Sequence, residues 1–409
     1  MSMRHTLGII KRRLRRVVTV AEAWAMPLLI RALARGVRRH RSPASTTTVV
    51  VTPHVSGNNG DVALIEAFVE NAPRPLLVVT REVTELPPSS DPDVEVIAVP
   101  HLIYGNTLAR WRALRVFVRR LRGARSVSLI GADVMDGHYN LSAAVRRAEL
   151  VRLGAASGIP SRVLGFSWNG TPEPLAARAL TSAARAGARL MAREPVSLDR
   201  LTALHLDVEL VTDLVLAASA TDADAAQDLL DGLGITGPYA IVNASGLVGR
   251  LTTQAEAYVE AIATLRAHGL EVVLLPHVIR KSGDDLAQLT GIKQRISEDI
   301  VLVTEVPPPA VVRSLCGGAD LVVSGRMHVG VMSLWAGTPA IILSTQGKVE
   351  GLTRVFGVPD LMVSLDHDLR VELPRKVSEA LASRDDLARR IADHQTTARQ
   401  LAHRNFDGL

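Results

Sequence analysis

The sequence predicts an α/β fold of two doubly wound, Rossmann-like domains that face a shared cleft. The chain has 409 residues, which is more than one hydrophobic core usually covers. Short runs rich in Val, Ile and Leu alternate with longer segments of helical period, which is typical of parallel strands with helices on both faces. A Gly-rich break at residues 231–240 interrupts the alternation, which then restarts and so indicates a second domain.

The apolar runs predict where the strands of both domains lie. Seven are expected in the first half, at residues 46–55, 75–82, 94–100, 126–131, 161–168, 188–194 and 208–213. Six follow in the second half, at 239–245, 271–278, 300–305, 320–325, 339–344 and 361–365. The chain therefore divides into a basic amphipathic tail (1–45), a first domain (46–234), a second domain (235–375) and C-terminal helices (376–409). Ligands of such folds bind at loops that follow the strands.

Composition and charge exclude several classes of protein. Hydrophobic residues make up 47% of the chain and charged residues 22%, as in ordinary globular proteins. The single cysteine, Cys316, excludes an intrachain disulfide or a multi-cysteine metal site and favours a reducing cytoplasm. The net charge of +6 belongs to the first 45 residues, which carry +10, whereas the remainder carries −4. Because no nucleic-acid-binding module is recognisable either, we expect no nucleic-acid partner.

The basic tail alternates Arg-rich clusters with an apolar run from Val17 to Ile30. This run contains Glu22 and Pro27, and it is shorter than the roughly 20 apolar residues that span a bilayer. Glu22 also argues against a signal peptide. Two interpretations stay open: an arm or helix that lies on the protein body, and a basic amphipathic segment on an anionic membrane surface. The second predicts a cytoplasmic protein in peripheral contact with a membrane.

The loop after the first strand reads "SGNNGDVAL". Asn58, Asn59 and Gly60 precede Asp61, which opens an apolar-periodic helix. Small residues let backbone N–H groups approach a ligand, and a helix N-terminus favours an anion or a polar group. The alternative is a Gly/Asn turn in which Asp61 is the N-cap of the helix.

Polar side chains also follow the fourth and sixth strands. Asp133, Asp136 and His138 cluster after the fourth strand, where they either perform acid–base chemistry, bind sugar hydroxyls or stabilise a turn. Arg193 stands at the exit of the sixth strand. Its planar guanidinium suits a carboxylate or phosphate, and the alternative is an ion pair with a neighbouring acid.

Two further sets of residues suggest buried or strand-end polar groups. Asp213 lies in the apolar context "VTDLVL", which predicts a buried carboxylate with a partner. His277 ends the strand at 271–278, and Asp284 and Asp285 follow seven and eight residues later. The histidine is either structural or part of a site with these acids.

The most unusual segment reads "SGRMHVGVMSLWAGTPAIILSTQGK". It places Ser324, Arg326 and His328 where a strand gives way to a helix, and Lys348 follows the next strand. At such a junction N–H groups, the helix dipole, a guanidinium and an imidazole converge on one anion. The alternative is a surface arginine and a core histidine.

In this order, the segments resemble the polysaccharide pyruvyl transferase family over most of residues 50–365. The resemblance rests on "NNGDVAL", "REPVS", "VTD", "PHV" with its downstream acids, "SGRMH", and "GTPAI" followed by Lys348. It implies a GT-B-like pair of domains, of which the first binds the acceptor and the second the donor phosphoenolpyruvate. The implied reaction attaches pyruvate to two hydroxyls of a sugar as a ketal and releases phosphate. It requires no metal and no cofactor beyond phosphoenolpyruvate as co-substrate.

The resemblance also assigns roles to the polar residues. Because phosphoenolpyruvate carries a carboxylate and a phosphate, it requires several cationic donors, and Arg193 is expected to close on it from the first domain. The substrate-binding candidates are Arg193, Arg326, His328, Lys348, Asn58, Asn59, Gly60 and Ser324. The candidates for proton transfer are Asp61, Asp136, His277 and His328.

Two alternative functions stay open. A GT-B-type glycosyltransferase would bind the diphosphate of a nucleotide sugar at Arg326 and Lys348, but "VVSGRMHVGVMSLWAG" lacks the acid expected to bind the ribose. A catalytically silent relative would bind glycan without turnover. In each case the acceptor or ligand is expected to be a glycan or a lipid-linked saccharide of the cell envelope.

Overall fold

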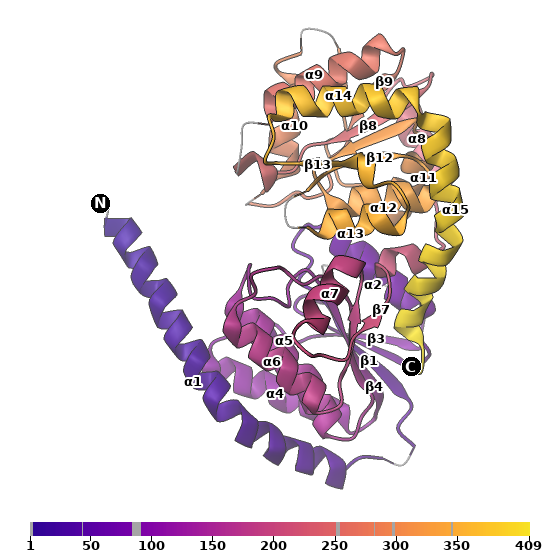
Figure 1. The fold of residues 1–409 in the computed structure, drawn as a ribbon. Helices are drawn as coiled ribbons and strands as arrows, with labels where there is room; N and C mark the ends of the chain where they lie inside the picture. The colour runs from indigo at the N-terminus through magenta and orange to yellow at the C-terminus, as the bar shows by residue number, and fades with distance from the viewer. Residues whose placement is uncertain are drawn as a thin grey trace. The chain divides into compact units, whose positions relative to one another are not determined.

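The computed structural model describes residues 3–42, 44–83, 91–250, 254–281, 283–296, 299–344 and 347–409, with side chains from Arg16 onward except that of Arg250. The chain forms two compact units (Figure 1). Unit 1 comprises Met1–His54, Val69–Val211 and Arg404–Leu409, and unit 2 comprises Val55–Phe68 and Thr212–His403. Each unit is built on one parallel sheet, which confirms the predicted fold class.

The sheet of unit 1 has seven strands in the order β3-β2-β1-β4-β5-β6-β7. They are β1 (Thr47–Val51), β2 (Leu76–Thr80), β3 (Val94–Ala98), β4 (Ala124–Ala132), β5 (Ser161–Phe166), β6 (Arg189–Ala192) and β7 (Glu209–Leu210). Every residue of β2 and β5 is buried, as expected for strands covered on both faces. Each strand overlaps one of the seven apolar runs of the first half.

The helices of unit 1 pack in layers on this sheet. They are α1 (Met3–Arg39), α3 (His101–Tyr104), α4 (Thr107–Leu121), α5 (Leu141–Ala156), α6 (Pro174–Arg185) and α7 (Pro195–Thr202). The side chains of Asn106 and Asn140 cap α4 and α5 by accepting the N–H groups of Ala109 and Ala143. Helix α5 contacts β4 and β5, and α1 packs against α5 and α4 (Figure 1). Helix α1 is therefore the outermost layer of this unit.

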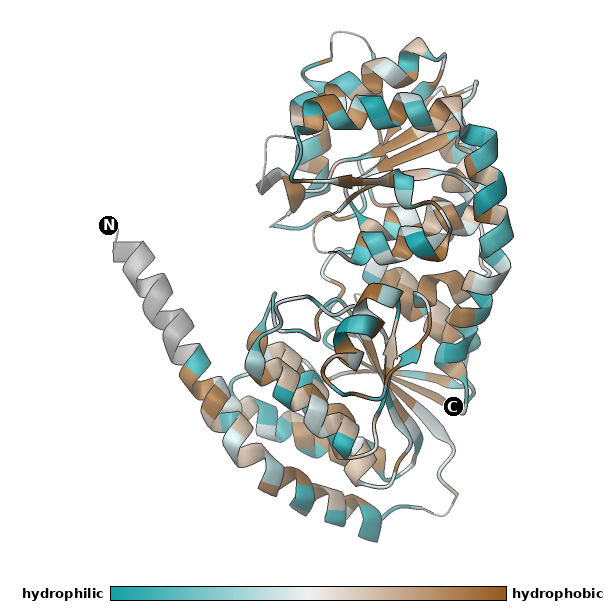
Figure 2. Ribbon diagram, viewed as in Figure 1, coloured by the Kyte–Doolittle hydropathy of each residue, from teal (hydrophilic) through white to brown (hydrophobic). Residues whose placement is uncertain are grey.

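The sheet of unit 2 has six strands in the order β10-β9-β8-β11-β12-β13, and they overlap the six runs of the second half. They are β8 (Tyr239–Asn243), β9 (Glu271–Leu274), β10 (Val301–Leu302), β11 (Leu321–Ser324), β12 (Ala340–Ser344) and β13 (Met362–Ser364). Its helices are α8 (Ala223–Gly232), α9 (Ala255–Ala267), α10 (Asp285–Lys293), α11 (Pro309–Gly318), α12 (Met327–Ala336), α13 (Lys348–Val355), α14 (Leu369–Ala382) and α15 (Arg384–His403). Apolar residues fill the strands of both sheets (Figure 2).

Two short connections complete the fold. Helix α2 (Asn59–Asn71) begins in unit 2 and ends in unit 1. After α15 the chain returns to unit 1, where the buried guanidinium of Arg162 donates to the backbone oxygens of Asp407 (2.7 Å) and Gly408 (2.8 Å). Leu409, the last residue, is itself buried.

The strand orders locate the edges where ligands are expected. The chain reverses its direction of winding between β1 and β4 in unit 1, and between β8 and β11 in unit 2. In doubly wound sheets the loops at such a point open a crevice outside the carboxyl ends of the strands. Polar residues after these strands are therefore the first candidates for a site.

Candidate functional site

The carboxyl edge of the unit 2 sheet gathers most of the predicted site residues. Ser324, the last residue of β11, is paired in register with Asn243 of β8, and its hydroxyl donates to the Asn243 side chain at 3.3 Å. Arg326 and His328 follow β11 directly, and Lys348 opens α13 after the adjacent strand β12. These residues therefore lie on loops that leave neighbouring strands at one edge of the sheet.

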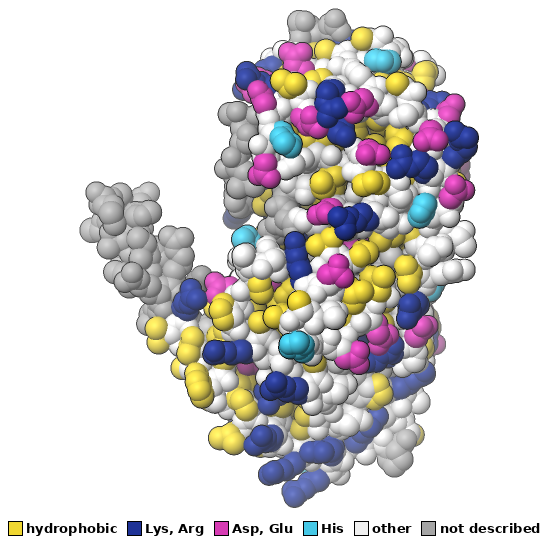
Figure 3. Space-filling view, in the orientation of Figure 1, with side chains coloured by type: hydrophobic (Ala, Val, Ile, Leu, Met, Phe, Trp, Pro, Cys, Tyr) yellow, Lys and Arg dark blue, Asp and Glu magenta, His cyan; other side chains and the backbone are white. Residues whose placement is uncertain are grey.

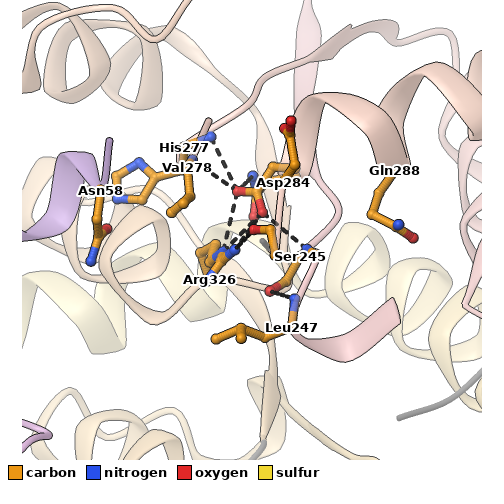
Figure 4. Close-up of polar contacts among 12 residues, drawn as sticks. Asn58, Ser245, Leu247, His277, Val278, Asp284, Gln288 and Arg326 are labelled. Atoms are coloured by element: carbon orange, nitrogen blue, oxygen red, sulfur yellow. Dashed lines mark hydrogen bonds and ion pairs between the residues drawn. The ribbon is translucent and has the colours of Figure 1, made fainter. Parts of the chain in front are cut away.

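A single buried carboxylate, that of Asp285, connects the loops that follow β8, β9 and β11. Figure 4 shows His277, Val278 and Arg326 gathered at this point, with their hydrogen bonds as dashed lines. The carboxylate accepts backbone N–H groups from His277 (3.3 Å) and Val278 (3.0 Å) after β9, and from Gly246 (3.0 Å) after β8. Hydrogen bonds from several backbone amides fix the position of a buried carboxylate. Asp285 therefore holds the loops of the switch point in one arrangement.

Arg326 is the main partner of this carboxylate. Its Nε lies 3.0 Å and its Nη2 2.6 Å from Oδ1 of Asp285, and Nη2 also donates to the backbone oxygen of Gly283 at 2.7 Å. Bidentate pairs of this kind are strong and directional. Among the described residues, Nη1 of Arg326 makes no hydrogen bond, and the side chain is 10% exposed. The guanidinium is thus held from one side and retains a donor for an anionic ligand.

His328 lies beside a second buried carboxylate, that of Asp213. The His328 Nε2 is 3.6 Å from Asp213 Oδ2, and the side chains are 14% and 1% exposed. The other oxygen of Asp213 accepts the N–H of Val215 at 3.1 Å, which fixes the carboxylate. A separation of 3.6 Å is long for a hydrogen bond, but contacts of catalytic pairs often shorten when substrate binds. The imidazole of His328 is therefore one neighbour of the buried Asp213 carboxylate.

His277 is fully enclosed, unlike His328. Neither of its ring nitrogens has a hydrogen-bond partner among the described residues. Burial lowers the pKa of its imidazole well below the ordinary value, and electrostatic interactions with His328 and Arg326 lower it further. His277 is therefore held neutral. Its backbone, which bonds Asp285 and Asn59, joins the loops of the site.

This burial predicts a pH dependence of stability. The unfolded chain protonates His277 near its ordinary pKa, whereas the folded protein does so only at lower pH, so stability falls as pH decreases below about 6.5. A full proton of difference corresponds to about 1.4 kcal/mol per pH unit. In His277→Gln the free energy of unfolding, measured by urea titration between pH 7 and 5, should fall less steeply than in the wild type. Equal slopes would show that His277 ionises normally in the folded protein.

The loop before α2 has a structural role in this edge. Residues 57–59 run antiparallel to 277–279, with the Asn59 N–H donating to the His277 oxygen and the Ile279 N–H donating to the Gly57 oxygen, both at 3.1 Å. Asn58 accepts the Gly60 N–H at 3.2 Å and donates to Asp61 at 2.7 Å. The backbone groups of residues 57–59 thus join the loop after β9 to the start of α2. Asn58, rather than Asp61, caps this helix.

Gly60 is required by close contact with His328. A Cβ at this position would lie 2.2 Å from His328 Nδ1 and 2.9 Å from its Cβ. We expect Gly60→Ala to destabilise the protein by about 1–3 kcal/mol, because overpacking outweighs the gain in helix propensity. Gly232→Ala, where a Cβ meets nothing within 4 Å, should be neutral or stabilising. Thermal unfolding of both variants tests this prediction, and equal midpoints would contradict it.

The remaining candidates belong to unit 1. Arg193 follows β6, is 3% exposed, and donates from Nε to the Ser167 hydroxyl at 2.7 Å. Asp136 follows β4 at the switch point and accepts the N–H of His138 at 2.9 Å. Burial raises the pKa of Asp136, and the charge of Asp133 adds to this effect. Because these residues lie in the other unit, their approach to the Arg326 group stays a prediction.

The roles of Asp285 and the Asp213–His328 pair were not assigned from sequence. In "SGDDLA" the first acid, Asp284, caps α10 by accepting the Leu286 N–H at 2.9 Å. Asp285, the residue after this cap, therefore lies in the first turn of α10. The adjacent pair of acids in the sequence was the one signal that could have indicated its role. Among the described residues, no three His, Cys, Asp or Glu side chains are grouped as metal ligands would be.

Solved structures with the same fold include enzymes that act on nucleotide sugars. A putative UDP-N-acetylglucosamine 2-epimerase from Listeria monocytogenes aligns with a TM-score of 0.59 at 13% identity, covering 88% of this chain and 95% of its own. A UDP-glucosyltransferase from Polygonum tinctorium aligns with a TM-score of 0.54 at 12% identity, covering 90% and 98%. At these identities the likeness establishes the two-domain fold alone.

The model of one protein family matches the sequence itself. It is described as polysaccharide pyruvyl transferase and covers residues 60–347, which include Gly60, Arg193, Asp213, Asp285 and Arg326. The match extends over more than half of the chain and confirms the resemblance seen in the sequence. The protein therefore belongs to the polysaccharide pyruvyl transferase family.

Proposed function

We propose that the protein is a transferase that moves the pyruvate unit of phosphoenolpyruvate onto a sugar of a cell-envelope glycan or glycolipid. The product is a ketal that bridges two hydroxyls, and phosphate is released. The observation that carries this proposal is the fixed cationic edge of unit 2, where Arg326 pairs with Asp285 and His328 lies beside Asp213. Family membership supports the same reaction class.

The donor would bind at this edge through its two anionic groups. Nη1 of Arg326 offers a donor to the phosphate or carboxylate, because Asp285 already occupies the other side of the guanidinium. Lys348 opens α13 on the neighbouring loop, where a cationic side chain and helix N–H groups favour an anion. A preorganised set of donors stabilises developing phosphate charge without reorganisation during the reaction.

We assign proton transfer at the donor to His328. The imidazolium would protonate the methylene carbon of phosphoenolpyruvate, so that the double bond becomes a methyl group and C2 an oxocarbenium-like centre. Asp213 would hold the ring in position. One sugar hydroxyl then attacks C2, and the second hydroxyl displaces phosphate. The two hydroxyls release two protons in these steps. One restores the proton that His328 gave to carbon, and the other is taken up by the released phosphate. His277 does not suit this role, because its strongly lowered pKa leaves the ring without the proton that the methylene carbon must receive.

Unit 1 offers a small recess of about 20 Å³, which would contact one edge of the acceptor rather than enclose it. It lies beyond the carboxyl ends of β1, β2 and β3, and its polar lining is Thr52, His54, Thr80, Arg81 and Tyr104. The guanidinium carbons of Arg81 and Arg147 lie 5.5 Å and 5.4 Å from the centre of the Tyr104 ring. An aromatic ring suits the apolar face of a sugar, and the cations suit a carboxylate or phosphate substituent.

Arg147 places a buried positive charge beside Tyr104, although it does not itself line the recess. It is 2% exposed, donates from Nη2 to the Tyr104 hydroxyl at 2.7 Å, and makes no ion pair with a carboxylate in the part of the chain that the structure describes. A buried guanidinium without a carboxylate is costly unless an anion binds beside it. Tyr104→Ala should therefore raise the KM for the acceptor and leave that for phosphoenolpyruvate unchanged, whereas Trp111→Ala, an exposed aromatic on α4, should change neither.

The main alternative is transfer of a sugar from a nucleotide sugar, since a UDP-glucosyltransferase shares the two-domain fold. The test measures phosphate release from phosphoenolpyruvate against nucleoside diphosphate release from UDP-sugars, with envelope glycans as acceptors. Phosphate release together with a pyruvate-sized mass increase of the glycan is expected. Diphosphate release would overturn the proposal. Binding of phosphoenolpyruvate without turnover of any acceptor would identify a silent relative.

A matched pair of arginine variants tests where the donor binds. Arg326→Ala should abolish binding of phosphoenolpyruvate, measured by calorimetry. Arg354→Ala removes an exposed guanidinium of α13 that pairs only with Glu350 among the described residues, and it should have no effect.

We further place the reaction in the cytoplasm, in keeping with the single buried thiol of Cys316.

A further inference from the structure

The outward face of α1 is apolar although the helix packs on unit 1 through its opposite face. Val17, Trp24 and Leu28 are 64%, 78% and 72% exposed, and Val18 and Val20 are about 40% exposed. Figure 3 shows hydrophobic side chains in succession along the outer edge of this helix. Exposed apolar groups that cluster in this way mark a binding surface rather than scattered surface residues.

The inward face explains why this apolar surface cannot turn into the core. Met26, Ile30, Ala34 and Val37 are buried in the hydrophobic core of unit 1. Glu22 accepts hydrogen bonds from Arg146 at 2.8 Å and from Thr107, and it lies 3.8 Å from Arg110. Rotation of the helix would expose this apolar set and break these buried ion pairs. The outward face is therefore held toward solvent.

The same face becomes cationic in its second half. Trp24, Leu28, Arg31, Arg35 and Arg38 are spaced by four and three residues in turn, so they form one stripe along the helix. The three arginines are exposed, and Figure 3 shows basic side chains gathered at this end of α1. Upstream, the sequence "KRRLRR" adds five further cations, and residues 1–45 carry +10 in total.

We propose that the outward face of α1 binds the surface of a bilayer that contains anionic lipids. Trp24 and Leu28 would enter the boundary between headgroups and acyl chains, and the arginines would bind lipid phosphates. This inference concerns where the protein acts and does not depend on the proposed reaction. In this arrangement α1 lies along the membrane surface and does not cross it, because the ion-paired Glu22 and the buried inward residues keep the helix on unit 1.

Two other occupants fit this surface less well. Within the described residues, Arg16–Arg39 is 24 residues long and apolar enough to cross a membrane by length and composition alone. Spanning would detach the inward face from its core contacts and carry Glu22 into hydrocarbon. A second copy of the chain would place arginines against arginines in a parallel pairing, and arginines against the apolar half in an antiparallel one. An anionic lipid surface offers acyl chains to the apolar half of this face and phosphates to its cationic half.

The test uses flotation of the full-length protein with vesicles of phosphatidylcholine, with or without 30% phosphatidylglycerol, where about a third anionic lipid mimics a charged leaflet. Strong binding only to the anionic vesicles is expected, and it should weaken as salt increases.

Trp24→Ser combined with Leu28→Ser should reduce binding at least about tenfold. Arg31→Gln, Arg35→Gln and Arg38→Gln together should reduce it about 100-fold. Val371→Ser, which removes an apolar side chain of α14 that is 65% exposed, should bind as the wild type does.

Several outcomes would overturn the proposal. One is equal binding to neutral and anionic vesicles, and another is unchanged binding by both α1 variants. A dimer in sedimentation that the Trp24→Ser, Leu28→Ser variant abolishes would identify a protein interface instead. Resistance of membrane-bound protein to alkaline carbonate would indicate a spanning helix. Because the substituted side chains are exposed, unchanged thermal unfolding of the variants should show that folding is intact.

Discussion

Asp285→Ala should both destabilise the protein and eliminate donor binding. The substitution removes the acceptor of three backbone N–H groups and leaves the guanidinium of Arg326 without its buried counter-charge. Loss of one partner of a buried ion pair typically costs about 3–5 kcal/mol. The free energy of unfolding, measured by urea titration, and the affinity for phosphoenolpyruvate, measured by calorimetry, should both fall.

Two further variants keep this prediction testable if Asp285→Ala fails to fold. Asp285→Asn retains one acceptor oxygen and the size of the side chain, so it should fold but bind the donor poorly. Asp284→Ala removes only the N-cap of α10 and should cost about 1 kcal/mol, with donor binding intact. If Asp285→Asn bound phosphoenolpyruvate as tightly as the wild type, the orientation of Arg326 by Asp285 would be irrelevant to the site.

Asp213→Asn should lower kcat by about 10²–10⁴-fold with little change in the KM for phosphoenolpyruvate. The carboxylate lies 3.6 Å from the His328 ring and is expected to hold the imidazolium that donates the proton. An amide keeps the shape of the side chain but loses the negative charge that stabilises this cation. Steady-state phosphate release with the native acceptor measures both constants.

The control for this prediction is Asp222→Asn, since Asp222 is an exposed acid that caps α8 in the same unit. It should leave kcat unchanged. Asp213→Glu should recover part of the lost rate because it restores the charge at a shifted position. An Asp213→Asn enzyme with wild-type kcat would show that His328 acts without this carboxylate or that another group is the acid.

The strands were predictable because both sheets are parallel and covered on both faces. Such strands must be apolar along their whole length, as "VVV" at 49–51 and "AIIL" at 340–343 are, so they stand out without any alignment. The placement of Arg326 and His328 after β11 followed from the same reasoning. Polar and charged groups that follow an apolar strand are candidates for a site, because ligands of such sheets bind at the carboxyl ends of the strands.

The pairings within the site were less accessible to sequence reasoning. Asp213 and His328 are 115 positions apart, and Asp285 and Arg326 are 41 apart. Which acid meets which cation depends on the order of strands in the sheet, and that order is a property of the folded chain. The Asn58–Gly60 loop shows the same difficulty, because its sequence suited an anion loop but its hydrogen bonds join α2 to the loop after β9.

The return of the last six residues to unit 1 limits how the chain can be dissected. A fragment that ends at Val211 would lack the carbonyl groups to which the buried Arg162 donates. Desolvation already lowers the pKa of that guanidinium to about 10 in the intact protein. Separate expression of the two units is therefore a poor route to a folded unit 1. An affinity tag fused after Leu409 would crowd this buried end of the chain, so a tag inserted in an exposed loop is better suited to purification.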